Sequence, residues 1–405
     1  MLVVRCSGSP YEIGLAHGQQ AQPLVRGSIA FYTALFLDRC AMSWAQVRAE
    51  ADAYTESLSR MPSARRYLDE LRGLADGAGV DFLDILAINI RTEIMFGLFT
   101  AAAAAAADST NPTTHANVPS DGCTSLAWKI PQQQTSYLAQ NWDWMTEQGE
   151  NLVICHIHPT SPATSSAMVD RQLPNIAMVT EAGIIGKIGF NAHGVGCLLN
   201  AIRARGVARS QLPVHFALRL VLESTSRDDA VAKLKAAGVA GSAHILVADA
   251  QVGSVGLECT PLGIKEVRMD AWGRVLHTNH LVLDHEGVDE PPWLDDSPRR
   301  LQRVSELADG LLPVAGDEVH VDMDQLKAVF RDEDDFPCSI NRRQDGECTT
   351  QTLFNIIMRL DKREAVVKVG RPSEEGEEVL LRTDDIWDES YEVLDGVEIS
   401  SKKEC

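Results

Sequence analysis

Hydrophobic residues recur at three- and four-residue spacings along the first hundred residues, which is the period of an amphipathic helix. The pattern runs through residues 11–38, 68–75 and 82–94. Gly79 and Asp81 separate the last two segments, as a helix stop and an N-cap do. The sequence therefore predicts a helical region over residues 1–99.

Composition changes between residues 100 and 122, where a run of alanines leads into a short polar segment that contains Pro. Such a composition is typical of a flexible, exposed linker.

From residue 123 onward, short apolar or alternating runs are separated by Gly, Asn and Pro, which predicts sheet strands. Helical patterns interrupt these strands at residues 213–224, 228–237, 298–308 and 323–330. The many predicted strands, together with helices that can cover both faces of a pair of sheets, predict an α+β fold for residues 123–383. Residues 384–405 are rich in Asp and Glu and are expected to form a solvated acidic tail.

The excess of acidic over basic residues bears on which macromolecules the protein can bind. The chain has 57 Asp and Glu against 37 Lys and Arg, a formal net charge of −20. Such a surface repels phosphate groups, so we expect neither nucleic acid nor an anionic membrane surface as a partner. The start of the chain lacks the apolar run of a secretory signal, and residues 94–107 fall short of the ~20 residues of a membrane span. We therefore expect a cytoplasmic protein.

Nine cysteines occur without a Cys-x-x-Cys pair, which favours thiols over a disulfide framework. Cys155, His156 and His158 are clustered, but no second pair at ligand spacing accompanies them, so we expect no metal site. Ile188 follows Lys187 where a phosphate-binding P-loop requires Ser or Thr. No cofactor is therefore expected.

Cys123 directly follows Asp-Gly at the end of the linker and at the start of a predicted strand. A thiolate at this place can attack the Gly122 carbonyl, form a thioester and let water split the chain. The new N-terminal amine, with a pKa near ~7.8, can then serve as general base for its own thiol. A Cys after Asp-Gly is more often a structural turn residue, so this motif alone does not decide the matter.

Longer motifs occur around this cysteine in a fixed order: PYEIGLAHG, INIRTE, SDGCTSLAWK, LAQNWDW, TEAGIIGKIGFN, ALRLVLESTS, GRVLHTNH and TLFNII. Together they resemble the isopenicillin N acyltransferase (acyl-CoA:6-aminopenicillanate acyltransferase) family of N-terminal-nucleophile hydrolases, over residues 11–372. The resemblance implies a four-layer αββα sandwich with an N-terminal helical region. It also implies self-cleavage between Gly122 and Cys123 into an α chain and a catalytic β chain that stay associated.

The resemblance also assigns roles to single residues. Cys123 matches the family's nucleophile, Asp143 an aspartate beside it, and Asn279 the asparagine whose side-chain NH2 donates to the oxyanion. Thr260 falls where the family has a serine needed for maturation. The alternatives are a strand-end turn residue for Asp143, a turn-capping residue for Asn279 and an ordinary strand residue for Thr260.

Three departures from the family pattern bear on substrate and location. Cys348 and Thr349 stand where the family has a Ser-Arg pair, whose arginine meets the penicillanate carboxylate. Threonine cannot form that bidentate contact, and Arg342 and Arg343 are the nearest guanidinium groups. The segment before Cys123 is longer than in the family, and the last three residues do not resemble a peroxisomal tripeptide.

Three functions remain open from the sequence. The first is an acyltransferase of secondary metabolism that moves an acyl group from a thioester, such as a coenzyme A co-substrate, or an amide to the amine of a small metabolite. The second is an amidohydrolase with water as the acceptor. The third is a non-catalytic relative that acts as a binding protein. Besides a small acyl donor and acceptor, the cleaved α chain is the expected partner.

Overall fold

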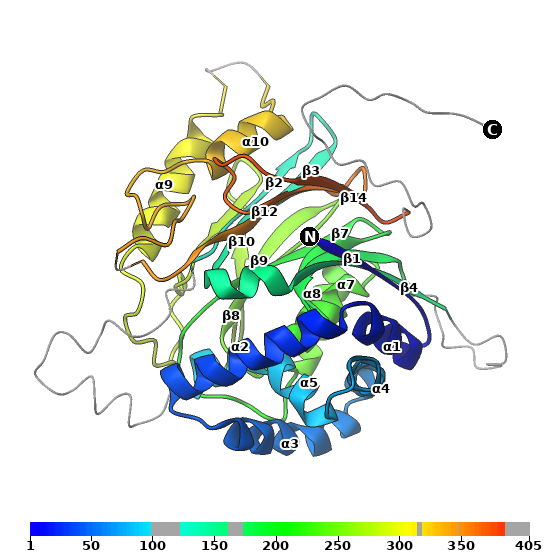
Figure 1. Ribbon diagram of the computed structural model, residues 1–405. Coiled ribbons are helices and arrows are strands. Elements are labelled where there is room, and N and C mark those ends of the chain that lie inside the picture. Colours follow the sequence, from blue (N-terminus) through cyan, green and yellow to red (C-terminus); the bar gives the residue numbers. More distant parts are fainter. Residues whose placement is uncertain (99–121, 161–172, 314–317, 347, 385–405) are drawn as a thin grey trace, which may run out of the picture.

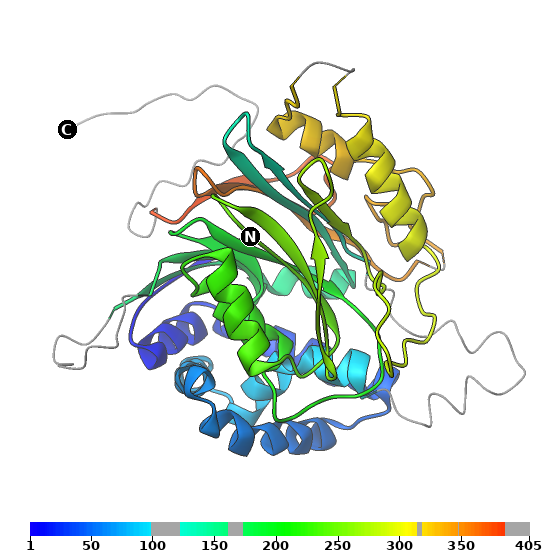
Figure 2. The same ribbon diagram turned by 180° about the vertical axis from the view of Figure 1, so that it is seen from behind.

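Two β-sheets lie face to face between two layers of helices in the computed structural model, which describes residues 1–98, 122–160, 173–313, 318–346 and 348–384. Figure 1 shows α9 and α10 on one outer side and α1 to α5, α7 and α8 on the other, and Figure 2 shows the same layers from behind. This is the predicted αββα order. The predicted linker up to residue 121 and the tail from residue 385 lie outside the described residues.

One helical layer is built mainly from the N-terminal part of the chain. The helices of this layer are α1 (Pro10–Gln20), α2 (Gln22–Cys40), α3 (Trp44–Arg60), α4 (Pro62–Ala78), α5 (Phe82–Asn89), α7 (Val214–Leu222) and α8 (Arg227–Ala237). The other layer consists of α9 (Ser297–Asp309) and α10 (Met323–Phe330). Over the described part of the chain, none of the helices has the length and apolar character to span a membrane.

The pattern over residues 11–38 forms two helices rather than one. The chain turns at Ala21, and Pro23 lies in the first turn of α2, where its missing N–H is not needed. The predicted stop at Gly79 is confirmed, because Gly79 has a φ of 63° and accepts the left-handed conformation at the end of α4. Gly14 allows α1 to touch α4, since a Cβ there would lie 1.8 Å from the Glu70 carbonyl oxygen.

The prediction of a helical region over residues 1–99 is wrong at the N-terminus. Residues Leu2–Gly8 form β1, which pairs in parallel with β4 (Leu152–Pro159) at the edge of the eight-stranded sheet. Val3 and Val4 suit a strand, and the segment is too short for a helical period to show. The N-terminal region thus contributes a strand to a sheet whose other strands all follow Cys123.

The eight-stranded sheet has the order β1-β4-β5-β6-β7-β8-β9-β10. Its remaining strands are β5 (Ile176–Glu181), β6 (Ile188–Asn191), β7 (Val195–Ala201), β8 (Ala243–Asp249), β9 (Gly253–Thr260) and β10 (Gly263–Arg268). The predicted strands are confirmed here, except that residues 184–187, which follow a turn at residues 182–183, are irregular and precede β6.

The six-stranded sheet has the order β11-β2-β3-β12-β13-β14. Its strands are β2 (Thr124–Ile130), β3 (Thr135–Trp144), β11 (Arg274–His277), β12 (Gln351–Arg359), β13 (Glu364–Val369) and β14 (Glu378–Arg382). Alternation along β2 turns Leu126, Trp128 and Ile130 toward a core shared with α9 and α10, whereas Ala127 belongs to the core between the sheets. Cys123 belongs to the inter-sheet core as well.

Candidate active site

The strand register brings three predicted site residues to one end of β2. In the β2–β11 pair, Ser125 lies opposite His277, so two residues further along Cys123 faces Asn279. In the β2–β3 pair, Thr124 lies opposite Asn141, which places Gly122 beside Asp143. Segments that are about 20 and 156 residues apart in sequence therefore meet at the Gly122–Cys123 bond.

Polar groups hold the backbone of Cys123 on both sides of its Cα. Its N–H donates to Oδ1 of Asn279 at 2.8 Å. Its carbonyl oxygen accepts hydrogen bonds from Nη1 of Arg300 at 2.8 Å and from Nδ2 of Asn200 at 3.2 Å. Since Cys123 is 1% exposed, these partners replace water and fix the peptide in one position.

Asn279 is itself held in one orientation. Its Oδ1 accepts from two groups that can only donate, the Cys123 N–H and Nη2 of Arg300 at 3.1 Å. Its Nδ2 donates to the Ala201 carbonyl oxygen at 3.0 Å, and its backbone N–H donates to Oγ of Ser297 at 2.8 Å. In this state the amide oxygen, not the NH2 group, faces the nitrogen of the Gly122–Cys123 bond. The oxyanion role of Asn279 stays a prediction.

Arg300 on α9 is the cation that contacts the Cys123 carbonyl oxygen. It is buried, it contacts the Cys123 carbonyl and Asn279, and its Nε lies 2.6 Å from Oδ2 of Asp296. Burial raises the pKa of Asp296, but Arg300 and Arg342 outweigh burial and lower that pKa below its ordinary value. Asp296 is therefore an anion at neutral pH, which compensates the two guanidinium groups.

Asp143 lies on the opposite face of β3 from the inter-sheet core, beside a second buried arginine. Its Oδ1 accepts a hydrogen bond from Oγ1 of Thr352 at 2.6 Å, and its Oδ2 lies 3.6 Å from Nε of Arg342. Arg342 also pairs with Asp296. Burial lowers the pKa of Arg342, but Asp296 and Asp143 outweigh it and raise that pKa above the ordinary value.

Arg342 lies against the glycine at position 122. A Cβ on Gly122 would lie 2.5 Å from Nε and 2.7 Å from Cζ of the Arg342 guanidinium, so any side chain there would force Arg342 to shift from its carboxylate partners. The planar guanidinium therefore covers the residue whose carbonyl is attacked in the predicted cleavage. Arg343, the other suggested arginine, is exposed.

The weaker predicted site residues differ in their placement. Thr260 ends β9, where its hydroxyl donates to the Gly263 carbonyl at 3.1 Å and accepts from the Leu262 N–H at 3.2 Å. These bonds shape the β9–β10 turn, so the structure does not bring the Thr260 hydroxyl into the Cys123 network. Cys348 does adjoin this network, because its Sγ lies 3.4 Å from Nη1 of Arg342, and half-buried Thr349 follows it.

The histidine cluster on β4 has the properties of core residues. His156 is buried, and burial lowers its pKa to about 4, so it is neutral at physiological pH. Over the described ranges, no three His, Cys, Asp or Glu side chains are grouped to hold a metal ion.

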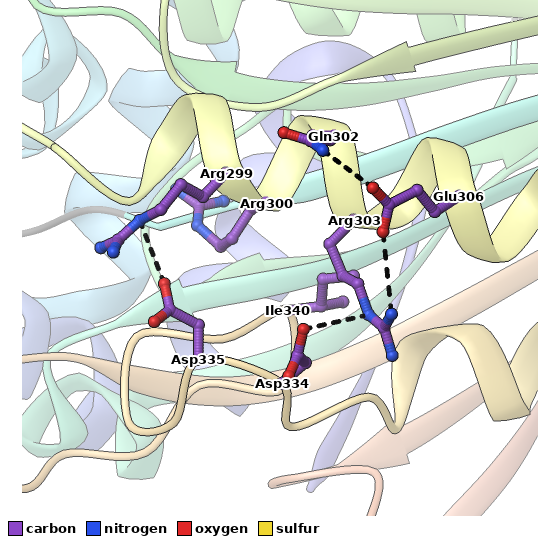
Figure 3. Close-up of a pocket in the computed structure, with 8 residues that line it drawn as sticks. All are labelled: Arg299, Arg300, Gln302, Arg303, Glu306, Asp334, Asp335 and Ile340. Atoms are coloured by element: carbon purple, nitrogen blue, oxygen red, sulfur yellow. Dashed lines mark hydrogen bonds and ion pairs between the residues drawn. The ribbon is translucent and has the colours of Figure 1, made fainter.

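A hollow of about 270 Å³ lies on the outer side of α9, between that helix and residues 334–340 (Figure 3). Its arginines face acids: Arg299 lies 3.1 Å from Asp335, and Arg303 lies 3.6 Å from Asp334. Paired charges of this kind weaken the attraction for a phosphate group, so the hollow does not resemble an anion site.

Comparison with known proteins identifies the family. The sequence model for acyl-coenzyme A:6-aminopenicillanic acid acyl-transferase matches residues 130–374. A protein of Emericella nidulans, the acyl-coenzyme A:6-aminopenicillanic-acid-acyltransferase 40 kDa form, is 34% identical over 390 residues, which make up 94% of this chain and 96% of that protein. The chain belongs to this acyltransferase family. It is accordingly an enzyme of the isopenicillin N acyltransferase-like N-acyltransferase or amidohydrolase type, and the predicted family resemblance is confirmed.

Other proteins to which the chain is similar have lower sequence identity. The β-alanyl-dopamine/carcinine hydrolase of Drosophila melanogaster is 24% identical over 242 residues, 58% of each chain. A variant of conjugated bile acid hydrolase from Clostridium perfringens covers 70% of this chain and 99% of its own, with 12% identity and a TM-score of 0.45. Penicillin V acylase from Agrobacterium tumefaciens covers 66% and 89%, with 14% identity and a TM-score of 0.42.

Sequence reasoning missed several residues that contact the predicted site in this acyltransferase family member. Asn200, Asp296 and Arg300 carry no local motif, and their closeness to Cys123 arises only when β7 and α9 pack against β2. The one available signal was the i,i+4 spacing of Asp296 and Arg300 in a helical segment, which favours an ion pair but not its location.

The two neighbouring arginines provide a matched test of the site's electrostatics. Arg342→Gln should lower the free energy of unfolding by about 3–5 kcal/mol, because it removes a guanidinium from buried carboxylates. Arg343→Gln, one residue away and exposed, should change it by less than about 0.5 kcal/mol. Urea denaturation followed by circular dichroism measures both, and equal stability of the two variants would contradict the buried network.

Proposed function

We propose that this enzyme is a self-processing acyltransferase whose nucleophile is the thiol of Cys123. The observation that carries the proposal is the backbone of Cys123, which Asn279 holds at the nitrogen and Arg300 and Asn200 hold at the carbonyl. Every buried backbone N–H and C=O needs a partner, but the partners of Cys123 are side chains from three other segments rather than the backbone of a neighbouring strand. A nucleophile whose own peptide bond must break needs such partners, because both the chain and the leaving amine have to stay in place.

The first reaction is the cleavage of the chain before Cys123. The thiolate attacks the Gly122 carbonyl carbon, the carbon–nitrogen bond breaks, and the Cys123 amine takes up a proton. Water then attacks the resulting thioester, which leaves a carboxylate on Gly122 and restores the thiol. Asn279 Oδ1, 2.8 Å from this nitrogen, is an acceptor for the new ammonium, and Arg342 beside Gly122 favours the developing carboxylate.

The second reaction uses the mature N-terminus. The α-amine, with a pKa near ~7.8, takes the thiol proton, and the thiolate attacks the acyl donor to form an acyl-enzyme. An amine acceptor, or water, then releases the acyl group. Asn279 supplies an oxyanion donor if its side chain turns after cleavage, and Asp143, anchored by Arg342 and Thr352, supplies a fixed negative charge at the same end of β2.

The α chain has a structural reason to remain bound after cleavage. Its strand β1 pairs with β4, and two buried ion pairs cross between the parts: Arg91 with Glu181 at 3.0 Å and Glu70 with Arg219 at 2.9 Å. The breaking of either pair would leave a buried charge uncompensated. We therefore infer that residues 1–122 and 123–405 form a permanent heterodimer.

For the substrates, we propose an acyl-coenzyme A or amide donor and a small amine acceptor, in a reaction of secondary metabolism. The names of the relatives, which contain acyl-coenzyme A and 6-aminopenicillanic acid, support the thioester donor and the amine acceptor. A hydrolase is the second candidate, because the Drosophila melanogaster relative is named as one. Both reactions pass through the same acyl-enzyme. Whether an amine or water then accepts the acyl group depends on how well the site excludes water.

The cleavage step makes a direct prediction. Purified protein should run as two fragments, the smaller ending at Gly122, whereas Cys123→Ala should remain one chain because no nucleophile is present. Gly122→Ala should also slow cleavage, since its methyl group collides with Arg342. Intact-mass spectrometry measures all three proteins, with Gly149→Ala, where a Cβ has only Leu353 at 3.7 Å, as the control. A wild-type preparation that stays full length while it turns over substrate would exclude self-processing.

The acceptor makes a second prediction. Thr349 stands where the family resemblance places an arginine, and Arg342 is already engaged with Asp143, Asp296 and Cys348. Loss of a bidentate contact should reduce the use of 6-aminopenicillanate by about ten- to a hundredfold. Cys348→Ser with Thr349→Arg should restore part of the activity in an assay with phenylacetyl-coenzyme A. High activity of the unmodified enzyme would show that another group binds the carboxylate.

A further inference from the structure

Two cysteines that the proposed reaction does not use lie beside Arg342. Residues 337–346 form a loop that folds back on itself, with the Arg343 N–H donating to the Pro337 carbonyl at 3.1 Å. The Sγ of Cys348 lies 3.8 Å from the same carbonyl oxygen, directly before Cys338 in the chain. Cys338 and Cys348 are therefore close in space, and neither is part of a disulfide.

The two thiols differ in exposure and in charge. Cys348 is buried and close to Arg342, whereas Cys338 is half-buried. Its interaction with Cys338 and the charge of Arg342 lower the pKa of Cys348 below its ordinary value, against the effect of burial. The same interaction raises the pKa of Cys338. The guanidinium of Arg342, 3.4 Å from the Cys348 sulfur, thus favours the thiolate form of Cys348 over that of Cys338.

Three other cysteines of the described chain have raised rather than lowered thiol pKa values. Burial raises the pKa of Cys40 to about 11 and raises the pKa of Cys197 and of Cys259 as well. Those thiols are protonated and enclosed, which makes them poor nucleophiles. A thiolate next to a second thiol, on a loop with a path to solvent, is the arrangement of a redox-reactive dithiol.

We propose that Cys338 and Cys348 are an oxidative modification site, at which a hydroperoxide converts the two thiols into a disulfide. The Cys348 thiolate attacks one peroxide oxygen, the O–O bond breaks, and one molecule of water or alcohol leaves after protonation. The Cys338 thiol then attacks the Cys348 sulfenic acid, the S–O bond breaks, and water leaves. The two sulfurs give up two electrons to the peroxide, so the reaction balances.

Oxidation acts on the active site through Arg342. The guanidinium contacts the Cys348 sulfur at 3.4 Å, lies beside Gly122, and pairs with Asp143 and Asp296. A disulfide sulfur carries no charge and is a poor acceptor, so Arg342 loses its thiolate partner. The disulfide also joins Cys338 to Cys348, which lie on either side of Arg342 in the chain. We therefore expect the oxidised enzyme to be less active.

Peptide mapping tests the site without reference to activity. Cys123→Ala protein is treated with hydrogen peroxide, blocked with iodoacetamide and digested without reductant. A disulfide-linked peptide pair containing Cys338 and Cys348 is expected, and it should disappear after dithiothreitol. Blocked, unlinked Cys338 and Cys348 under conditions that oxidise an added dithiol peptide would overturn the proposal.

An activity assay tests the consequence, and this arm alone rests on the proposed function. Peroxide should lower acyl transfer by about tenfold or more, as expected for a lost charge-assisted contact, and dithiothreitol should restore it. Cys338→Ser should keep its basal activity but lose the recovery with dithiothreitol, because the Cys348 sulfenic acid has no partner thiol and is oxidised further to the sulfinic acid. If Cys338→Ser recovers with dithiothreitol as fully as the wild type, oxidation of another thiol is the cause and the proposed coupling to Arg342 is wrong.

Discussion

The antiparallel pairing of β2 with β11 on one side and β3 on the other is the constraint on which the site depends. This pairing places Asn279 opposite Cys123 and Asp143 beside Gly122, before any side chain has made a contact. A slip of one residue in either pair would turn each side chain to the other face of the sheet. The mixed burial of β2, with Trp128 in the outer core and Ala127 in the inner one, opposes such a slip.

Buried ion pairs fix the residues that the strand register brings together. Two arginines and two aspartates are buried around the Gly122–Cys123 bond, and each guanidinium has a carboxylate partner. Buried ion pairs of this type add little net stability, but the loss of one member is costly. The network is therefore better suited to fix positions than to stabilise the fold, which is what a reaction on the protein's own backbone requires.

The sequence predicted much of this arrangement, because strands and helices with clear periods can be recognised locally. Cys123, Asp143 and Asn279 were identified through motifs, and the structure brings them to one place. What sequence reasoning missed depends on packing between distant segments: β1 becomes a strand only by pairing with β4, and Arg300 reaches Cys123 only because α9 covers β2. Thr260 shows the converse, since its hydroxyl serves a local turn that the motif could not indicate.

The most direct test of the account is the identification of the acylated atom. The enzyme is mixed with phenylacetyl-coenzyme A, quenched in acid within the first turnovers and analysed by mass spectrometry. The account predicts one phenylacetyl group on the fragment that begins with Cys123, attached as a hydroxylamine-sensitive thioester to that residue. An acyl group on any other residue, or on an uncleaved chain, would contradict the claim that Cys123 is the N-terminal nucleophile.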